Sequence, residues 1–315
     1  MYVEQFAIGV DLGATKIASA LVSPTGQVLE TRQALTSPQD GPEAVLDRLA
    51  IEIEALVRQS PGKLAGVGIG SPGSVDSANG IVRNAVNLGW CEVSLVSGVS
   101  ARLQNGLPIW VQKDANASAL GEFHFGSGQG CQDFVYITIG SGLGGGVIAN
   151  GQLITGAYGN AAELGHLSLD PNGRPCACGL RGCAETIVSG PGLVATLSDL
   201  LDQGKYASNL FGTHELTPAI ILDAARMGDE ASRMAFNEIG TALGNVLAAC
   251  VAVLNPARFI IGGGVGQAAF DLIEPAANLE LARRVTKSSC GQLEIIPSQL
   301  ASSAVGAACL VWQRK

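Results

Sequence analysis

The chain has 315 residues, of which 47% are hydrophobic and 15% charged, and its formal net charge is −8. This composition excludes a disordered chain and supplies enough core for two lobes. A nucleic-acid-binding protein needs a basic surface to displace counterions from phosphates, and the acidic balance of this chain argues against that class.

The first part of the chain alternates predicted strands with helices. Apolar runs bounded by turns predict strands at Phe6–Asp11, Ile17–Val22, Leu64–Gly70 and Pro108–Gln112, with a glycine/proline loop after the third. Apolar residues at helical spacing predict a helix from Pro42 to Ser60, and a second helix is predicted at Ala115–Gly126. This alternation is typical of an α/β fold with a parallel or mixed sheet.

The same order of elements begins again near the middle of the chain. IGVDLGATKIASALVSPTG, near the start, and ITIGSGLGGGVIANGQLITG, further on, both predict a strand, a glycine turn, a strand and a tight turn. Further along the chain, the pattern predicts helices at Thr217–Met227, Glu230–Leu254 and Ser303–Trp312 and a strand at Arg258–Gly262. We therefore expect two duplicated lobes.

One segment, Ile239–Ala257, carries no charge and is a candidate membrane span. It contains Gly240, Gly244 and Asn245, and a buried helix of a large lobe explains it better than a span does. The start of the chain lacks the basic segment, long apolar core and cleavage site of a signal peptide. We expect a cytoplasmic protein without a membrane partner, whose eight cysteines are reduced.

Asp11 to Lys16 form a predicted turn between the first two strands. Gly13 lets backbone N–H groups approach phosphate oxygens, while Thr15 and Lys16 add a hydroxyl and a positive charge. Asp11 can hold Mg²⁺, directly or through water, since this ion prefers carboxylate and phosphate oxygens. The spacing of a Walker A motif is missing, and an ordinary hairpin remains the alternative.

Two further glycine turns follow predicted strands. Gly140, Ser141 and Gly142 open a glycine run, but the strand after it, in place of a helix, argues against a dinucleotide site. Gly263 and Gly264 follow a later strand and can face an adenine or a ribose. Three such turns at strand ends favour a nucleotide site.

A cluster of metal-binding residue types lies between these turns. His166 precedes Cys176, Cys178 and Cys183, so that four donors fall within 18 residues and fit a tetrahedral zinc site. Because the protein fills all four positions, no position remains for a reactive water, and the metal has a structural role. Free thiols in a glycine loop are the alternative.

Asp114 follows a predicted strand and precedes a predicted helix. A carboxylate at a strand end can accept the proton of a sugar hydroxyl as that hydroxyl attacks a phosphate. Aspartate at this position is also a good helix N-cap, and the residue taken alone leaves both roles open.

Taken together, the motifs resemble those of the ROK family (repressors, open-reading-frame kinases and sugar kinases), within the hexokinase/actin-like superfamily. The resemblance runs, in family order, through VDLGATKI, GIGSPGSVD, NAVNLGW, KDANASALGE, TIGSGLGGGVIANGQL, GNAAELGH, CACGLRGCAE and IIGGGV. It implies an α/β fold of two duplicated actin-like, ribonuclease-H-like lobes with a cleft between them. The small lobe would comprise residues 1–117 and about 298–315, and the large lobe, with the zinc loop, residues 118–297.

The resemblance also implies an ATP-dependent hexose kinase acting on a 6-hydroxyl, with glucose as the expected sugar. Asp114 matches the catalytic base, and the sugar-side positions are Gly73, Asn87, Lys113, Asp114, Glu163, His166 and Glu185. The phosphate and nucleotide positions are Asp11, Gly13, Thr15, Lys16, Gly140, Ser141, Gly142, Gly263 and Gly264. The implied cofactors are ATP, catalytic Mg²⁺ and structural Zn²⁺, and the implied assembly is a homodimer.

The chain departs from the family pattern at Lys113, where family kinases usually carry asparagine. Lysine has donors only, and its charge can weaken Asp114 as a base. Either the sugar differs from plain glucose, or Lys113 turns outward and another group reads the hydroxyl.

Other functions remain open at this point. The sugar can be N-acetylmannosamine, N-acetylglucosamine or fructose, or the protein can be a sugar sensor with weak or no kinase activity. A sugar-responsive repressor would carry an N-terminal helix-turn-helix, and the first strand, at about Phe6, argues against one. An unrelated zinc-stabilised module would have no nucleotide affinity.

Overall fold

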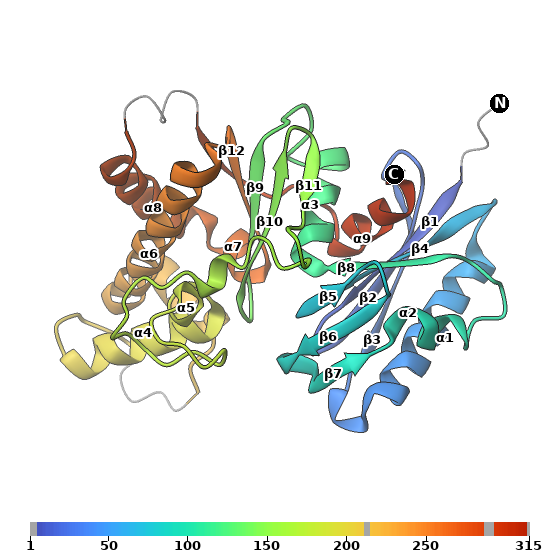
Figure 1. Cartoon of the computed structure of the whole chain (residues 1–315). Coiled ribbons are helices and arrows are strands. Elements are labelled where there is room, and N and C mark those ends of the chain that lie inside the picture. The colour runs from blue at the N-terminus through green and yellow to red at the C-terminus, as the bar shows by residue number, and fades with distance from the viewer. Residues whose placement is uncertain (1–4, 211–214, 287–292, 314–315) are drawn as a thin grey trace. The chain divides into compact units, whose positions relative to one another are not determined.

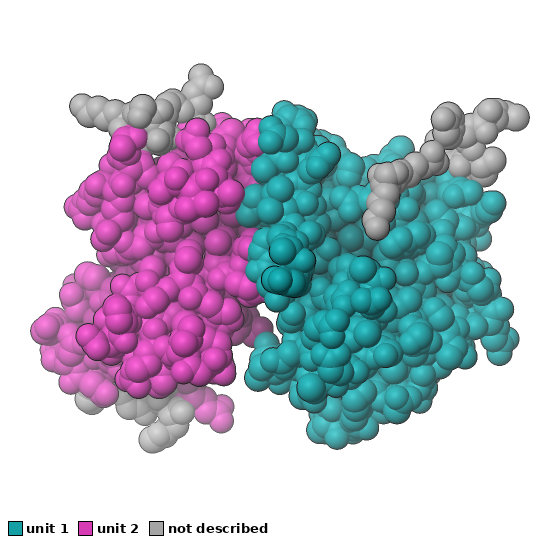
Figure 2. Space-filling model, viewed as in Figure 1, with its two compact units in different colours: residues 1–132, 146–161, 299–315 teal, residues 133–145, 162–298 magenta. Residues whose placement is uncertain are grey.

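The computed structural model describes residues 5–210, 215–286 and 293–313. The chain forms two compact units, coloured separately in Figure 2. Unit 1 comprises residues 1–132, 146–161 and 299–315, and unit 2 comprises residues 133–145 and 162–298.

Unit 1 is built on a five-stranded mixed sheet with the order β3-β2-β1-β4-β8. Its strands are β1 (Phe6–Leu12), β2 (Lys16–Val22), β3 (Val28–Leu35), β4 (Leu64–Ser71) and β8 (Ile109–Lys113). The pairs β1–β2 and β2–β3 are antiparallel, whereas β1–β4 and β4–β8 are parallel. Asp11 pairs with Gly70 and Ser71 pairs with Lys113, so the carboxyl ends of β1 and β8 lie at the same edge of the sheet.

Four α-helices of unit 1 accompany this sheet (Figure 1): α1 (Pro42–Gln59), α2 (Leu95–Ser100), α3 (Asp114–Phe125) and α9 (Ser303–Trp312). Helix α9 packs against β1, β4 and α3. The approach is close because glycines face it. A Cβ atom on Gly9 would lie 1.8 Å from the Ala304 carbonyl oxygen, and one on Gly68 would lie 1.9 Å from that of Ala307.

A small antiparallel sheet occupies the region after β4 where the sequence predicts only a loop. It consists of β5 (Ser74–Asp76), β6 (Ile81–Ala85) and β7 (Trp90–Val93). Short 3₁₀ helices, η1 (Pro38–Asp40) and η2 (Val86–Leu88), complete unit 1. The strands of this sheet are short and carry charged residues between their apolar ones, so no clear alternation marks them.

A second five-stranded sheet has the order β11-β10-β9-β12-β13. Its strands are β9 (Phe134–Ile139), β10 (Leu143–Ala149), β11 (Gln152–Ile154), β12 (Arg258–Gly262) and β13 (Glu294–Pro297). Strand β12 pairs in parallel with β9 and with β13, whereas β10–β11 is antiparallel. The order repeats that of the first sheet, with three consecutive strands followed by two that arrive through crossovers. This repeat confirms the predicted α/β class and its duplicated pattern.

Five α-helices belong to the described part of unit 2: α4 (Gly190–Gln203), α5 (Pro218–Arg226), α6 (Glu230–Leu254), α7 (Gly264–Ala268) and α8 (Phe270–Arg284). The unit also holds the 3₁₀ helices η3 (Leu164–His166) and η4 (Ala184–Thr186). Ser189, Thr217 and Asp229 cap α4, α5 and α6 with their side-chain oxygens, each accepting from a backbone N–H.

Helix α6 contains most of the uncharged segment that is a candidate membrane span. By length and composition alone it is the one helix among the described residues able to cross a membrane. However, 56% of its most apolar window is buried, and it packs against α4, α5 and α8. This burial agrees with the prediction of a core helix.

The compact units differ in extent from the predicted lobes, 1–117 with about 298–315 and 118–297. Residues 118–132 and 146–161 cluster with unit 1. The reason is local packing. Helix α3 continues to Phe125 along α9, and Gly146 lies so near the Ala115 carbonyl oxygen that a Cβ atom would come within 2.6 Å of it.

Candidate functional site

In unit 1 the segment from Asp11 to Lys16 forms a tight turn between β1 and β2. The Gly13 N–H donates to the Lys16 carbonyl oxygen at 3.0 Å, and the Thr36 hydroxyl donates to the Gly13 carbonyl oxygen at 2.6 Å. Thr15 and Lys16 are exposed. The turn is thus fixed from both sides while its hydroxyl and its ammonium face solvent.

Asp11 lies near the end of β1, at the start of this turn. Burial raises the pKa of its carboxyl above the usual 3.8, and a hydrogen bond from the Ser303 hydroxyl and the charge of Lys16 oppose that rise. A carboxylate whose pKa is raised by burial gains from a nearby cation. The surroundings of Asp11 therefore fit the predicted Mg²⁺ ligand.

Asp114 is the first residue of α3, directly after β8. Its Oδ1 accepts a hydrogen bond from the Ala115 N–H at 2.6 Å. The helix N-terminus attracts negative charge, which suits a residue placed to accept a proton. Lys113 occupies the N-cap position itself, so the capping alternative does not describe Asp114 fully.

Lys113 does not turn outward, contrary to one of the two possibilities raised by the sequence. Only 5% of the residue is exposed, and its Nζ donates to the Ala161 carbonyl oxygen at 3.3 Å. Its backbone N–H donates to Oε1 of Gln112 at 2.8 Å. The ammonium therefore lies inside unit 1, beside the residue predicted to be the base.

Gly73 and Asn87, the other predicted sugar-side positions of unit 1, lie at the small sheet. Gly73 has φ +84°, and a Cβ atom there would lie 2.1 Å from the Asn84 carbonyl oxygen, so glycine is required. Asn87 is exposed in η2. The adjacent Ser74 hydroxyl lies 2.8 Å from Oδ1 of Asn160, which ties the loop before residue 161 to β5.

The four predicted zinc ligands of unit 2 come together. One donor atom from each of His166, Cys176, Cys178 and Cys183 lies within 4.8 Å of the other three. The Cys178 and Cys183 sulfurs are 3.6 Å apart, and Cys176 Sγ lies 3.9 Å from His166 Nδ1. Tetrahedral zinc with bonds of about 2.3 Å places sulfurs about 3.8 Å apart, so the cluster fits this ion.

The chemistry of the donors agrees with this geometry. Burial raises the pKa of the Cys183 thiol to about 12, so a cation is needed for it to lie here as a thiolate. Gly182 has φ +67°, and a Cβ atom there would collide with the Asp170 carbonyl oxygen at 1.5 Å. The loop thus folds tightly around the cluster, as the glycines in the sequence predict.

Two carboxylates flank the cluster. Glu163 directly precedes η3, after Ala162, which has the unusual φ of +61° for a non-glycine residue. Glu185 lies in η4, and its Oε2 accepts a hydrogen bond from the Leu143 N–H at 2.9 Å. The cysteine loop and the turn of residues 140–142 are therefore joined by one carboxylate.

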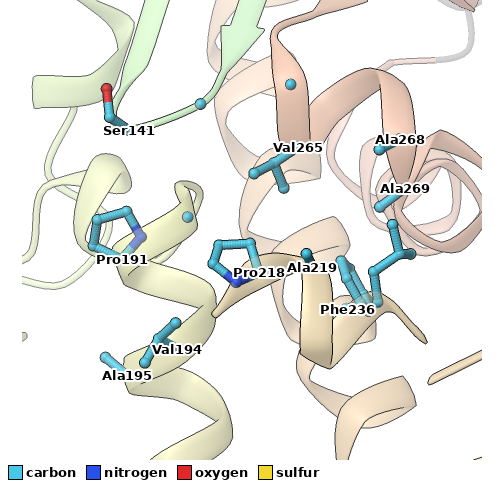
Figure 3. Close-up of a pocket in the computed structure, with 14 residues that line it drawn as sticks. Ser141, Pro191, Val194, Ala195, Pro218, Ala219, Phe236, Val265, Ala268 and Ala269 are labelled. Carbon is cyan, nitrogen blue, oxygen red and sulfur yellow. The ribbon is translucent and has the colours of Figure 1, made fainter. Parts of the chain in front are cut away.

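Unit 2 also contains a cavity of about 750 Å³ (Figure 3). Its walls come from the turn before β10 and from α4, α5, α6 and α7, through Gly140, Ser141, Gly190, Pro191, Val194, Ala195, Pro218, Ala219, Leu222, Phe236, Gly264, Val265, Ala268 and Ala269. In Figure 3, Pro191, Pro218 and Val265 surround its centre. A cavity of this size holds a nucleoside.

The structure thus joins some of the predicted nucleotide positions. Gly140, Ser141 and Gly264 line this one cavity, and Gly142 and Gly263 adjoin them in the chain. The helical walls of the cavity were not predicted. Apart from Gly190 and the predicted Gly264, their residues are proline, alanine, valine, leucine and phenylalanine, which the sequence does not distinguish from core residues.

Comparison with known proteins agrees with these features. The model of the ROK family matches residues 7–314. The chain is 38% identical to a glucokinase of Thermotoga maritima over 98% of this chain and 97% of that protein. It is 33% identical to an N-acetylmannosamine kinase of Shigella boydii, over 83% and 84% of the two chains.

A solved structure extends the comparison to three dimensions. The ROK family glucokinase of Streptomyces griseus, crystallised with glucose and AMPPNP, is 33% identical to this chain. The match covers 98% of this chain and 100% of that one, with a TM-score of 0.85.

Proposed function

Because the chain belongs to the ROK family, we propose that it is an ATP-dependent hexose kinase that phosphorylates the 6-hydroxyl of glucose. The observation that carries this proposal is the arrangement of two carboxylates in unit 1. Asp11 lies near the carboxyl end of β1 and Asp114 directly follows β8, and these strand ends lie at one edge of the sheet with β4 between them. One carboxylate serves a metal ion and the other serves a hydroxyl.

Asp114 is the proposed general base. As the sugar 6-oxygen forms its bond to the γ-phosphorus, the bond from that phosphorus to ADP breaks and the hydroxyl proton passes to Asp114. The Ala115 N–H holds the carboxylate in place. Little further covalent chemistry falls to the protein, so its main contribution is to position and to stabilise charge.

The donor sites are assigned unit by unit. In unit 1, Asp11 is the proposed Mg²⁺ ligand, and Gly13, Thr15 and Lys16 are proposed to contact phosphate. In unit 2, the turn of Gly140, Ser141 and Gly142 is proposed to contact phosphate through its backbone, and the 750 Å³ cavity to hold the base and ribose beside Gly263 and Gly264.

The proposed zinc site is structural. When bound by His166, Cys176, Cys178 and Cys183, the ion supplies four bonds that fix the loop carrying the sugar-binding residues. Glu163, Glu185 and His166 are proposed to contact sugar hydroxyls, together with Gly73, Asn87 and Lys113 of unit 1. Carboxylates select hydroxyls strongly, because a sugar without the matching group leaves a desolvated charge unpaired.

The resemblance to the family also supports the proposal that the protein is cytoplasmic and forms a homodimer.

A second candidate function is that of an N-acetylhexosamine kinase, which the similarity to the N-acetylmannosamine kinase favours. The burial of Lys113 adds weight, because it removes the outward orientation of this residue and leaves a sugar other than plain glucose as the other possibility that the sequence raised.

The test is a coupled ADP-release assay with Mg-ATP and glucose, mannose, fructose, N-acetylglucosamine or N-acetylmannosamine. We expect turnover on glucose, and a loss of at least about 100-fold in kcat for Asp114→Asn, which removes the general base. Asp202→Asn makes the same change at an exposed residue of α4 and should leave turnover unaltered. Turnover on an N-acetylated sugar alone would favour the second candidate. Tight sugar binding without turnover would leave a sensor.

A further inference from the structure

The cavity of unit 2 is apolar on nearly every side. Of its fourteen lining residues, thirteen are glycine, alanine, proline, valine, leucine or phenylalanine, and within the described part of the chain Ser141 supplies the one polar side chain. Figure 3 shows the Ser141 hydroxyl directed away from the proline rings. Among the described residues that line the cavity, Ser141 alone has a side chain able to hydrogen-bond the edge of a base.

Some backbone groups of the walls are also engaged. The Gly140 N–H donates to the Gly142 carbonyl oxygen at 2.9 Å, and the Gly140 carbonyl oxygen accepts from the Gly190 N–H at 2.7 Å. Pro191 and Pro218 have no N–H to offer. The Ala269 N–H donates to the Val265 carbonyl oxygen at 3.0 Å. These hydrogen bonds occupy both backbone polar groups of Gly140 and the N–H of Ala269, so these groups are not offered to the edge of a base.

Discrimination between purines depends on such groups. Adenine, hypoxanthine and guanine differ in the donors and acceptors on their edges, whereas their size and their faces are nearly the same. A site that hydrogen-bonds an edge rejects the wrong partner by about 10⁴-fold or more, but an apolar site discriminates by only about 10–200-fold. Apolar and aromatic walls attract every base through its faces.

We propose that this cavity accepts purine nucleoside triphosphates without reading the edge of the base, so that ITP and GTP serve as phosphoryl donors beside ATP. The inference rests on the proposed function, and it concerns the donor alone. The triphosphate is common to all of these nucleotides, and its proposed contacts with the glycine turns do not depend on the base.

The order among donors follows from desolvation. Guanine has more polar groups to remove from water than adenine, and the cavity returns few hydrogen bonds. GTP is therefore expected to be poorer than ATP, with ITP between them, and all three within about 200-fold in kcat/KM. CTP and UTP lack the second ring, bury less apolar surface and are expected to be about tenfold poorer still.

The experiment measures kcat/KM for ATP, ITP, GTP, CTP and UTP with the preferred sugar in excess. Direct titration of the full-length protein with AMPPNP and GMPPNP gives the binding constants independently of turnover. Ala219→Leu places bulk in the cavity, and we expect the KM of every nucleotide to rise by a similar factor, about tenfold. Ala249→Leu makes the same change at an exposed position of α6 outside the cavity and should leave every KM unchanged.

The outcomes separate this inference from the proposed function. Purine triphosphates within about 200-fold of one another, all weakened by Ala219→Leu, support it. Turnover with ATP and more than about 200-fold less with both ITP and GTP overturns it while leaving the kinase intact. If no nucleotide supports turnover, the kinase proposal fails. In that case the binding constants of AMPPNP and GMPPNP test the tolerance for the base, and a difference of more than about 200-fold overturns it.

Discussion

Glu185 offers the sharpest single test of how unit 2 works. Its Oε2 accepts from the N–H of Leu143, a residue that is only 4% exposed, and the same carboxylate is a proposed sugar ligand. Replacement by glutamine keeps an oxygen for the Leu143 N–H but turns a charged acceptor into a neutral one. Such a change costs about 1 kcal/mol per hydrogen bond, or about fivefold in affinity.

We therefore expect Glu185→Gln to raise the KM for glucose about five- to tenfold and to leave the KM for ATP nearly unchanged. Glu185→Ala removes the acceptor entirely and leaves the buried Leu143 N–H without its partner, at a cost of about 1–3 kcal/mol. That cost falls on the turn of residues 140–142, so the KM for ATP should rise as well, by about tenfold.

Initial rates with each substrate varied at saturating levels of the other give both constants, and thermal melting reports folding. An Ala variant that raises the KM for glucose and leaves that for ATP unaltered would refute the role of Glu185 in holding the glycine turn. A Gln variant with an unaltered KM for glucose would refute its role as a sugar ligand.

Two further predictions follow from the cluster and from Asp11. Cys183→Ser should abolish zinc binding and lower Tm. Elemental analysis should find one zinc ion per chain in the parent protein. Cys250→Ser changes a buried thiol outside the cluster and should keep the metal. Asp11→Asn should lower kcat by about 100-fold or more yet raise Tm at pH 7.5, because burial raises the pKa of this carboxyl and its ionised form disfavours the folded state. Because the pKa of Asp11 is raised in the folded protein, ionisation of this carboxyl destabilises the parent protein as the pH rises above the usual 3.8. The gain in Tm of Asp11→Asn over the parent protein should therefore shrink towards pH 4. A gain that does not change with pH would contradict the raised pKa of Asp11.

The sequence predicts best what is local. The zinc ligands fall within 18 residues, and the strands at β1, β4 and β9 are continuous apolar runs, so both are readable from short windows. The glycine turns are readable for the same reason.

Features that depend on distant residues could not be predicted in this way. Leu143 and Glu185 are 42 residues apart, and nothing in either segment indicates that they bond. The cavity takes its walls from helices spread between residues 190 and 269, and each wall residue alone resembles a core residue. The burial of Lys113 against Ala161 likewise depends on a loop 48 residues further along the chain.

The seam between β1, β4 and α9 bears on how the chain is made. The Gly9 and Gly68 positions leave room for α9 alone, yet Ser303 follows Phe6 by 297 residues. At about 5–20 residues per second, a ribosome adds that length in about 15–60 s. During that time the part of the sheet face around Gly9 and Gly68, which α9 covers, has no covering helix, so a nascent chain of this protein should need a chaperone until α9 emerges.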